Sequence, residues 1–195
     1  YDLRTARRSL NLLSIEWANR GINLWTIEEG SISLVDGTSQ YNLPADTIDL
    51  LDHVVRTGTG TSQSDINISR VSVSTYASIP NKNAEGRPIQ VWIDRQAATP
   101  QINVWPVPNN NTDTFIYWRM RRIQDAGNGV NTQDIPFRLL PCLVARLAYY
   151  LSLKIPEAMN RIEMLKASYE EQWNLASGED RDKTSLRLAP REFFY

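Results

Sequence analysis

The spacing of apolar residues changes twice along this chain, and that change limits the folds open to it. Between residues 3 and 20, apolar side chains recur every three or four residues, as on one face of a helix: Leu3, Ala6, Leu10, Leu13 and Trp17. Helical spacing returns between residues 137 and 178. The residues between instead form short alternating runs separated by turns. This order predicts an α+β protein with a β domain between terminal helices.

The middle region has the spacing of an antiparallel sheet. Residues 31–43 predict a hairpin, because alternating residues flank an Asp36-Gly37 turn. Residues 57–67 are rich in Gly, Thr and Ser and predict a mobile loop. Residues 68–79 predict a short strand or a helical turn. Further strands are expected over residues 47–56, 89–93, 101–105 and 114–123. Short strands at this spacing predict a sandwich or a barrel.

The helical ends have recognisable boundaries. Gly21 is expected to cap the first helix, because glycine enters the left-handed conformation freely. The helix expected after Pro136 has a wide apolar face between Leu139 and Leu151, which is typical of a helix buried on more than one side. Pro156 is expected to begin a last helix, since its fixed φ costs little there, and Gly178 to end it.

The charge of the chain is balanced overall but uneven along its length. Twenty-one basic residues face 22 acidic ones, for a net charge of −1, whereas a free-standing nucleic-acid binder is usually more basic. Residues 1–24 carry four arginines against two acids. Residues 25–136 carry eight basic against twelve acidic groups, a net charge of −4. The chain is therefore not expected to grip DNA strongly.

No set of residues suited to catalysis is recognisable. His53 is the only histidine, and no Gly-x-Ser-x-Gly motif supplies a nucleophile for it. Asp46, Asp49 and Asp52 would share a face on a helix and suit a hard cation, but a strand is expected there. The Gly58–Thr61 run lacks the lysine of a phosphate-binding loop. We predict no enzyme activity, no cofactor and no metal.

The single cysteine and the hydropathy pattern exclude two other classes. Cys142 stands alone in an apolar stretch, so it forms no internal disulfide and is expected to be a small buried side chain. No run of about 18 apolar residues is present, so no membrane span is expected. The cytoplasm, or a particle assembled there, is the expected location.

The densest basic cluster lies on the strand expected over residues 114–123. Arg119 and Arg121 would point to one face of it, with Arg122 beside them. Such a cluster suits contact with DNA phosphates, with acids of a neighbouring subunit, or with solvent alone. Six Trp and eight Tyr are available for subunit contacts or for a sugar-binding platform.

Several short motifs follow one another along the chain. Arg20-Gly21 ends the first helix and is followed by Trp25 and by a Gly-x-x-x-Tyr-x-Leu-Pro-x-Asp run from Gly37 to Asp46. The later motifs are Gly86-Arg87-Pro88, Pro106-Val107-Pro108 and Asp134-Ile135-Pro136. In this order they resemble the head-to-tail adaptor proteins of short-tailed bacteriophages. The resemblance covers most of the chain and is weakest over residues 184–195.

The resemblance implies a fold and a place in a virion. Residues 1–24 and 137–178 would form an antiparallel helical bundle, residues 25–136 an inserted β domain, and residues 179–195 an extended C-terminal arm. The protein would form a ring of twelve copies at the head-tail junction, beneath the portal. The ring would extend the DNA channel, without sequence-specific binding, and provide a docking surface for tail nozzle or tail fibre proteins. The arm would contact the portal through Leu186, Leu188, Pro190, Phe193, Phe194 and Tyr195.

Two alternatives stay open at this point. Another neck or tail protein of a bacteriophage would share the absence of a recognisable catalytic set. A β-sandwich carbohydrate-binding module would carry a row of aromatic residues on one concave face and would not need long terminal helices.

Overall fold

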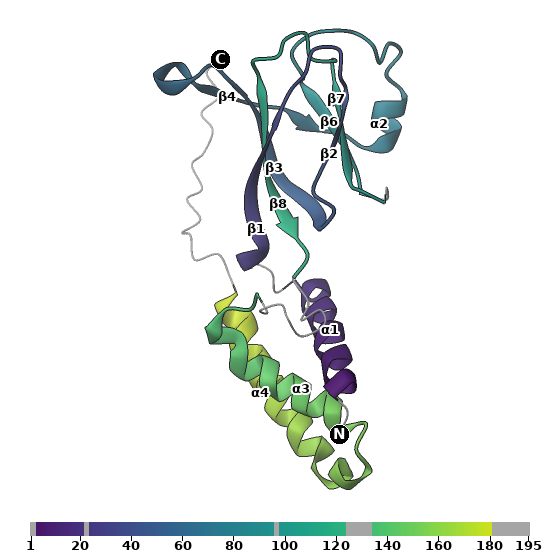
Figure 1. Ribbon diagram of the computed structural model, residues 1–195, viewed down its shortest axis with the longest axis vertical. Helices are drawn as coiled ribbons and strands as arrows, with labels where there is room; N and C mark the ends of the chain where they lie inside the picture. Colours follow the sequence, from purple (N-terminus) through teal and green to yellow (C-terminus); the bar gives the residue numbers. More distant parts are fainter. Residues whose placement is uncertain (1–2, 22–23, 96–97, 124–133, 181–195) are drawn as a thin grey trace, which may run out of the picture. The chain divides into compact units, whose positions relative to one another are not determined.

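The computed structural model describes residues 3–21, 24–95, 98–123 and 134–180 (Figure 1). Helices and strands both contribute, so the expected α+β class is confirmed. The chain divides into two compact units, one of residues Trp25–Gln124 and the other of Tyr1–Leu24 with Asp125–Tyr195. We call them the β unit and the helical unit. No helix in the described ranges has the length and apolar character needed to cross a bilayer.

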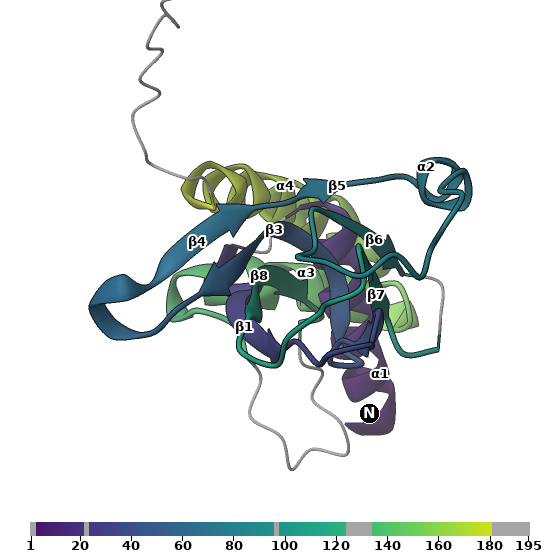
Figure 2. The same cartoon turned by 90° about the horizontal axis from the view of Figure 1, so that it is seen from above.

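The β unit is a sandwich of two four-stranded sheets (Figure 2). The first sheet has the strand order β1-β8-β3-β4, formed by Ile27–Ser33, Thr114–Arg121, Thr47–Thr57 and Ser64–Asn67. The second has the order β2-β7-β6-β5, formed by Gln40–Asn42, Gln101–Trp105, Gln90–Asp94 and Ser69–Arg70. All pairings are antiparallel except that of β5 with β6. A short helix, α2 (Val73–Ala77), follows β5.

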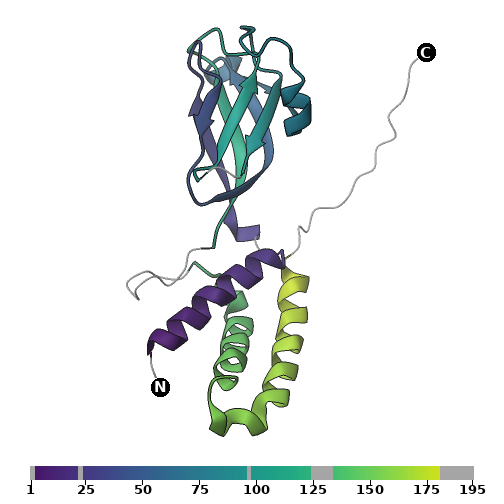
Figure 3. The same ribbon diagram turned by 90° about the vertical axis from the view of Figure 1, so that its right-hand side faces the viewer.

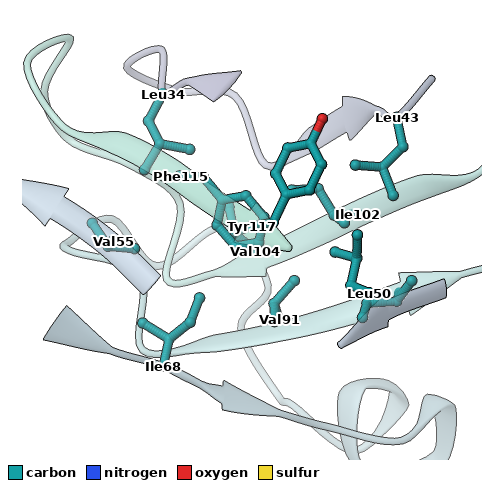
Figure 4. Close-up of a cluster of buried hydrophobic side chains, with 11 residues drawn as sticks. Leu34, Leu43, Leu50, Val55, Ile68, Val91, Ile102, Val104, Phe115 and Tyr117 are labelled. Atoms are coloured by element: carbon teal, nitrogen blue, oxygen red, sulfur yellow. The ribbon is translucent and has the colours of Figure 1, made fainter. Parts of the chain in front are cut away.

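The core of the sandwich lies between the two sheets (Figure 4). Both sheets contribute side chains to it because successive residues of a strand point to opposite faces. Phe115 and Tyr117 come from β8, and Val91, Ile102 and Val104 from the second sheet. Ile68 lies in the same core between β4 and β5, where the chain passes from one sheet to the other.

Two loops of the β unit differ from what the sequence predicts. The hairpin expected over residues 31–43 is wrong, because β1 pairs with β8 and β2 with β7 of the other sheet. The turn residues are in place, with Gly37 at a φ of 74°. The loop is closed by Tyr41 instead of by a ladder: Val35 N–H donates to Tyr41 Oη over 2.9 Å, and Tyr41 Oη donates to Thr38 O over 2.8 Å.

The mobile loop expected over residues 57–67 is also wrong, because it contains β4. Gly58 and Gly60, with φ of 72° and 59°, turn the chain back so that Val54–Thr57 pairs with Ser64–Asn67. Arg56 donates to both carboxylate oxygens of Asp65, over 2.8 and 2.9 Å. Because most residues of β4 are exposed and polar, it has no alternating apolar pattern to announce it.

The helical unit contains three α-helices: α1 (Leu3–Asn19), α3 (Leu140–Ser152) and α4 (Ile162–Glu179). Short 3₁₀ segments, Phe137–Leu139 and Pro156–Arg161, precede α3 and α4. Figure 3 shows α3 and α4 running in opposite directions. Gly21 has the left-handed φ of 83° that its role after α1 predicts.

The buried side chains of the helical unit come from all three helices: Leu13, Trp17, Leu139, Cys142, Leu143, Tyr169 and Ala176. Trp17 and Trp173 pack with their ring centroids 6.4 Å apart, which joins the C-terminal part of α1 to α4. The wide apolar face expected on α3 is only partly buried, because Leu140 and Val144 are exposed.

Candidate functional site

Arg119 and Arg121 lie at one end of the sandwich, in line with its core. Odd-numbered residues of β8 point inward, so these arginines continue the row begun by Phe115 and Tyr117. Their side chains are only 11% and 10% exposed. The two arginines are therefore part of the interior face, beyond the last apolar layer.

Two acidic residues neutralise this pair of arginines. Arg119 donates to Asp46 Oδ1 over 2.6 Å, to Thr47 Oγ1 over 3.0 Å and to Glu28 Oε2 over 2.9 Å. Arg121 Nε donates to the other oxygen of Glu28. Glu28 reaches Arg119 because it lies directly opposite it in the β1–β8 ladder. We call these four charged residues, Glu28, Asp46, Arg119 and Arg121, the end cluster.

Within the end cluster, Asp46 and Arg119 each favour the ionised form of the other. Burial would raise the pKa of Asp46, but the hydrogen bond and charge of Arg119 lower it below its ordinary value. Burial would likewise lower the pKa of Arg119, and its bonds to Asp46 and Glu28 raise it. Arg122 differs, because its side chain is exposed. Its backbone N–H donates to Asp46 O over 2.8 Å, and its carbonyl oxygen accepts from Arg121 Nη1 over 3.3 Å.

A second arginine cluster lies inside the helical unit. Arg146 of α3 donates to both carboxylate oxygens of Glu16 on α1, over 3.1 and 2.6 Å, and Tyr150 Oη donates to the same carboxylate over 2.7 Å. The Arg146 guanidinium lies 4.4 Å from the ring centre of Tyr169 and 4.5 Å from that of Tyr150. The ion pair joins α1 to α3, and the contact of the same guanidinium with the Tyr169 ring adds α4.

A small cavity of about 340 Å³ lies beside this second cluster. Arg20 is one of the residues that line this cavity. Its guanidinium lies 4.7 Å from the ring centre of Trp173 and forms an ion pair of 2.9 Å with Glu16. Burial raises the pKa of Tyr169, which lines the cavity, to about 12. The tyrosine is therefore neutral at physiological pH, and Glu16 is shared by two arginines.

Another cavity lies in the β unit and measures about 480 Å³. Arg70 and Arg95 line it, and both bind Asp49, over 2.8 and 2.9 Å. Trp92 also lines it and stacks on Tyr76, with ring centroids 5.2 Å apart. The cavity has charged and aromatic walls but no nucleophile paired with a base.

The residues considered for catalysis or metal binding do not converge. Asp46 joins the end cluster and Asp49 binds Arg70 and Arg95, whereas Asp52 accepts a hydrogen bond from the backbone of His53. Across the described ranges, no group of three or more acidic, histidine or cysteine side chains is placed to hold a metal ion.

His53 and Cys142 are both buried, and the apolar neighbours of Cys142 in the sequence predict its burial. The His53 ring stacks on Phe115, with centroids 5.9 Å apart. Its pKa is lowered by burial and by Arg70, against the opposing charge of Asp52. Burial raises the pKa of the Cys142 thiol to about 11, so it is not a ready nucleophile.

All three helices of the helical unit carry exposed apolar side chains, which the sequence alone does not identify as surface residues. Phe137 is 85% exposed, and Leu140 and Val144 follow it on α3. Leu12 and Ile15 on α1 and Met164 and Leu175 on α4 are exposed as well. Their helical spacing is visible in the sequence, but which side of each helix faces the core is not. The residues assigned to the portal-contact arm, Leu186 to Tyr195, lie outside the described residues.

One comparison with known proteins identifies a relationship for almost the whole chain. The family model described as "SU10 adaptor protein" matches residues 2–191. No match to a curated protein was found. The match confirms the resemblance to adaptor proteins that the order of the short motifs predicted.

Proposed function

Because this chain belongs to the SU10 adaptor protein family, a family of structural bacteriophage proteins, we propose that it is the head-to-tail adaptor itself. In this role it attaches beneath the portal, extends the DNA channel and provides the docking surface for the tail nozzle or tail fibre proteins. The observation that carries the proposal is the family match over residues 2–191. The protein would then act at the head-tail junction, in DNA ejection, without an enzymatic step.

The copies would form a closed ring, for which we propose twelve members. A ring repeats one heterologous contact until it closes, so each subunit needs two different complementary surfaces. The exposed apolar side chains on α1, α3 and α4 support this assignment, because such residues are typical of protein contacts when they cluster. Residues 1–24 and 137–178 would form the ring-building bundle, residues 25–136 the inserted β domain, and residues 179–195 the arm.

A channel for DNA works best without a strong electrostatic grip, because each phosphate contact adds a salt-dependent attraction. The end cluster supports this reading, since Glu28 and Asp46 already occupy Arg119 and Arg121. For either arginine to contact DNA or a neighbouring subunit, it would first have to release Glu28 or Asp46. Of the three arginines that the sequence predicts as a cluster, Arg119, Arg121 and Arg122, only Arg122 has an exposed side chain.

The proposal is tested by mixing the purified protein with the portal protein of the same phage and imaging the mixture by negative-stain microscopy. Ring-shaped complexes that carry additional density at one end of the portal are expected. A protein that stays separate from the portal at every concentration would overturn the assignment.

The arm has its own test. Deleting residues 186–195 is expected to abolish attachment to the portal, since Phe193, Phe194 and Tyr195 would be the aromatic anchors. The thermal unfolding midpoint should not change. A lower midpoint would instead show that these residues stabilise the folded chain.

A further inference from the structure

The outer faces of α1 and α4 carry complementary side chains. An α-helix turns by about 100° per residue, so Arg8, Leu12 and Ile15 fall within about 60° of each other on α1. All three are exposed, while Leu13 and Trp17 point into the unit. This outer face of α1 is basic toward the N-terminus and apolar toward the C-terminus.

The outer face of α4 has the opposite charge. Met164, Glu171 and Leu175 fall within about 40° of each other, and all three are exposed. Tyr169 and Ala176, on another side of the helix, are buried in the unit. Apolar residues therefore flank an acidic centre on this helix.

The two faces also match in length. Arg8 and Ile15 are seven residues apart on α1, and so are Met164 and Glu171 on α4. At 1.5 Å per residue, both pairs span about 10.5 Å. When the helices are laid antiparallel, Ile15 meets Met164 while Arg8 meets Glu171. An apolar contact and an ion pair form together in this one register.

The two faces cannot meet within one subunit. Their inward sides are already occupied, and Figure 3 shows the N-terminal half of α1 diverging from α4 within the helical unit. Contact inside the unit between these helices is at the C-terminal part of α1, where Trp17 packs on Trp173 and Arg20 donates to Tyr169 Oη. Neighbouring copies of the chain can cover both faces, one copy on the α1 face and another on the α4 face.

We infer that the outer face of α1 of one copy binds the outer face of α4 of the next, with Ile15 on Met164 and Arg8 paired to Glu171. The inference rests on the proposed function, for which it names the subunit contact. Since the two faces differ, the contact is heterologous, and a pair of copies keeps one free α1 face and one free α4 face. The contact therefore propagates from copy to copy, as ring formation requires.

Cysteine cross-linking tests the register directly. Ile15 and Met164 are 54% and 63% exposed, so replacing them with cysteine should not disturb folding. The variant with both Ile15→Cys and Met164→Cys is oxidised at high concentration, alone and with the portal protein, and run on a non-reducing gel. A ladder of trimers and larger species is expected, because each chain then carries both halves of the disulfide.

The single-cysteine variants are the matched controls. Each can form at most a dimer through its new cysteine, and buried Cys142 is common to all the chains. If the double variant gives no species beyond those of the single variants under either condition, the inference is wrong. Portal-bound rings without this ladder would overturn the subunit contact alone, while a ladder without portal binding would overturn the proposed function alone.

Charge reversal gives an independent measurement. Arg8→Glu or Glu171→Arg alone should weaken self-association in sedimentation by about tenfold or more, and the two changes together should restore it. Lys166→Glu is the control, because Lys166 is exposed on the opposite side of α4 from Met164. Failure of the double variant to recover association, or an equal loss from Lys166→Glu, would contradict the contact.

Discussion

His53 lies on β3 with its ring against Phe115 and only 7% of its surface exposed. At such a position the neutral imidazole is favoured over the cation, because burial removes the water that would solvate the charge. Arg119 of the end cluster is buried to a similar extent, yet its pKa is raised, because its bonds to Asp46 and Glu28 outweigh the effect of burial. The difference between these positions is the presence of a hydrogen-bonded partner of opposite charge.

The stability of the protein should therefore depend on pH through His53. Its pKa in the folded state is lowered, so its stabilising effect is complete above the unfolded pKa near 6.5 and is lost as pH falls below that value. One such group changes the free energy of unfolding by at most about 1.4 kcal/mol per pH unit. Denaturant unfolding between pH 7.5 and 5 should show a steeper loss for the wild type than for His53→Gln. Equal slopes would show that His53 does not control this range.

At Gly30, a single added carbon atom is expected to change the stability of the fold. Gly30 lies opposite Tyr117 in the β1–β8 ladder, and a Cβ added there would meet the tyrosine ring at 2.4 Å. Gly30→Ala should lower the free energy of unfolding by about 1–3 kcal/mol, because the buried ring must shift. Gly86→Ala is the control, since its Cβ would lie 3.6 Å from Pro106. A change within about 0.5 kcal/mol is expected there.

Positions of this kind are hard to predict from sequence. The burial of Cys142 follows from its apolar neighbours, and the sequence suggests it correctly. The close approach of Gly30 to Tyr117 depends on which strands are neighbours, and 87 residues separate the two along the chain. Local patterns hold no information about that pairing.

At the scale of elements, β8 links the core to the end cluster. It is the strand between β1 and β3, and its inward row passes from Phe115 and Tyr117 to Arg119 and Arg121. One strand thus supplies both the apolar packing and the charged end of the sandwich. The alternation of β8 predicted that Arg119 and Arg121 share a face, but the acids that meet them come from β1 and from the residue just before β3.

Replacing Arg119 should lower the stability of the protein, because its acidic partners lose their hydrogen-bond donor. Arg119→Met keeps an unbranched apolar stem in place of the arginine but leaves Asp46 and part of Glu28 without their donor. A loss of about 1–3 kcal/mol in the free energy of unfolding is expected. Arg122→Met, beside it on the chain and exposed, should change stability by less than about 0.5 kcal/mol. A similar small effect for both variants would mean that solvent replaces the ion pairs.

Prediction of elements succeeded where apolar spacing is strong and failed where pairing is non-local. The strands β3, β6, β7 and β8 and the helix α1 lie where their periods predict them. The residues of β1 and β2 also alternate, but only long-range contacts decide that they belong to different sheets. Polar β4 is held by β3 and by the Arg56–Asp65 pair, and neither leaves a local signal.

On the scale of the whole molecule, the β unit is an insertion with its two ends together. Ile27, near its start, pairs with Met120, near its end, in neighbouring strands. Chain entry and exit at one place allow the helical segments before and after the unit to belong to a common structure. The first strand, β1, begins at Ile27, close to the start of the unit at Trp25.

The β unit should fold by itself. A fragment of residues 25–124 contains the complete core cluster of the sandwich, and 100 residues are enough for a cooperative domain. Circular dichroism of the fragment should show strand content and a single unfolding transition. An unfolded fragment would mean that the sandwich needs residues of the helical unit.

The adjacent ends of the β unit also set how it would respond to force. The hydrogen bonds of an antiparallel ladder lie perpendicular to its strands. A pull that separates Ile27 from Met120 acts along those bonds and loads them one after another, starting at that pair. The sandwich would therefore peel open from its base at low tension instead of resisting as a whole. If a load reached the unit through its two connections, the β1–β8 ladder would be the first part to yield.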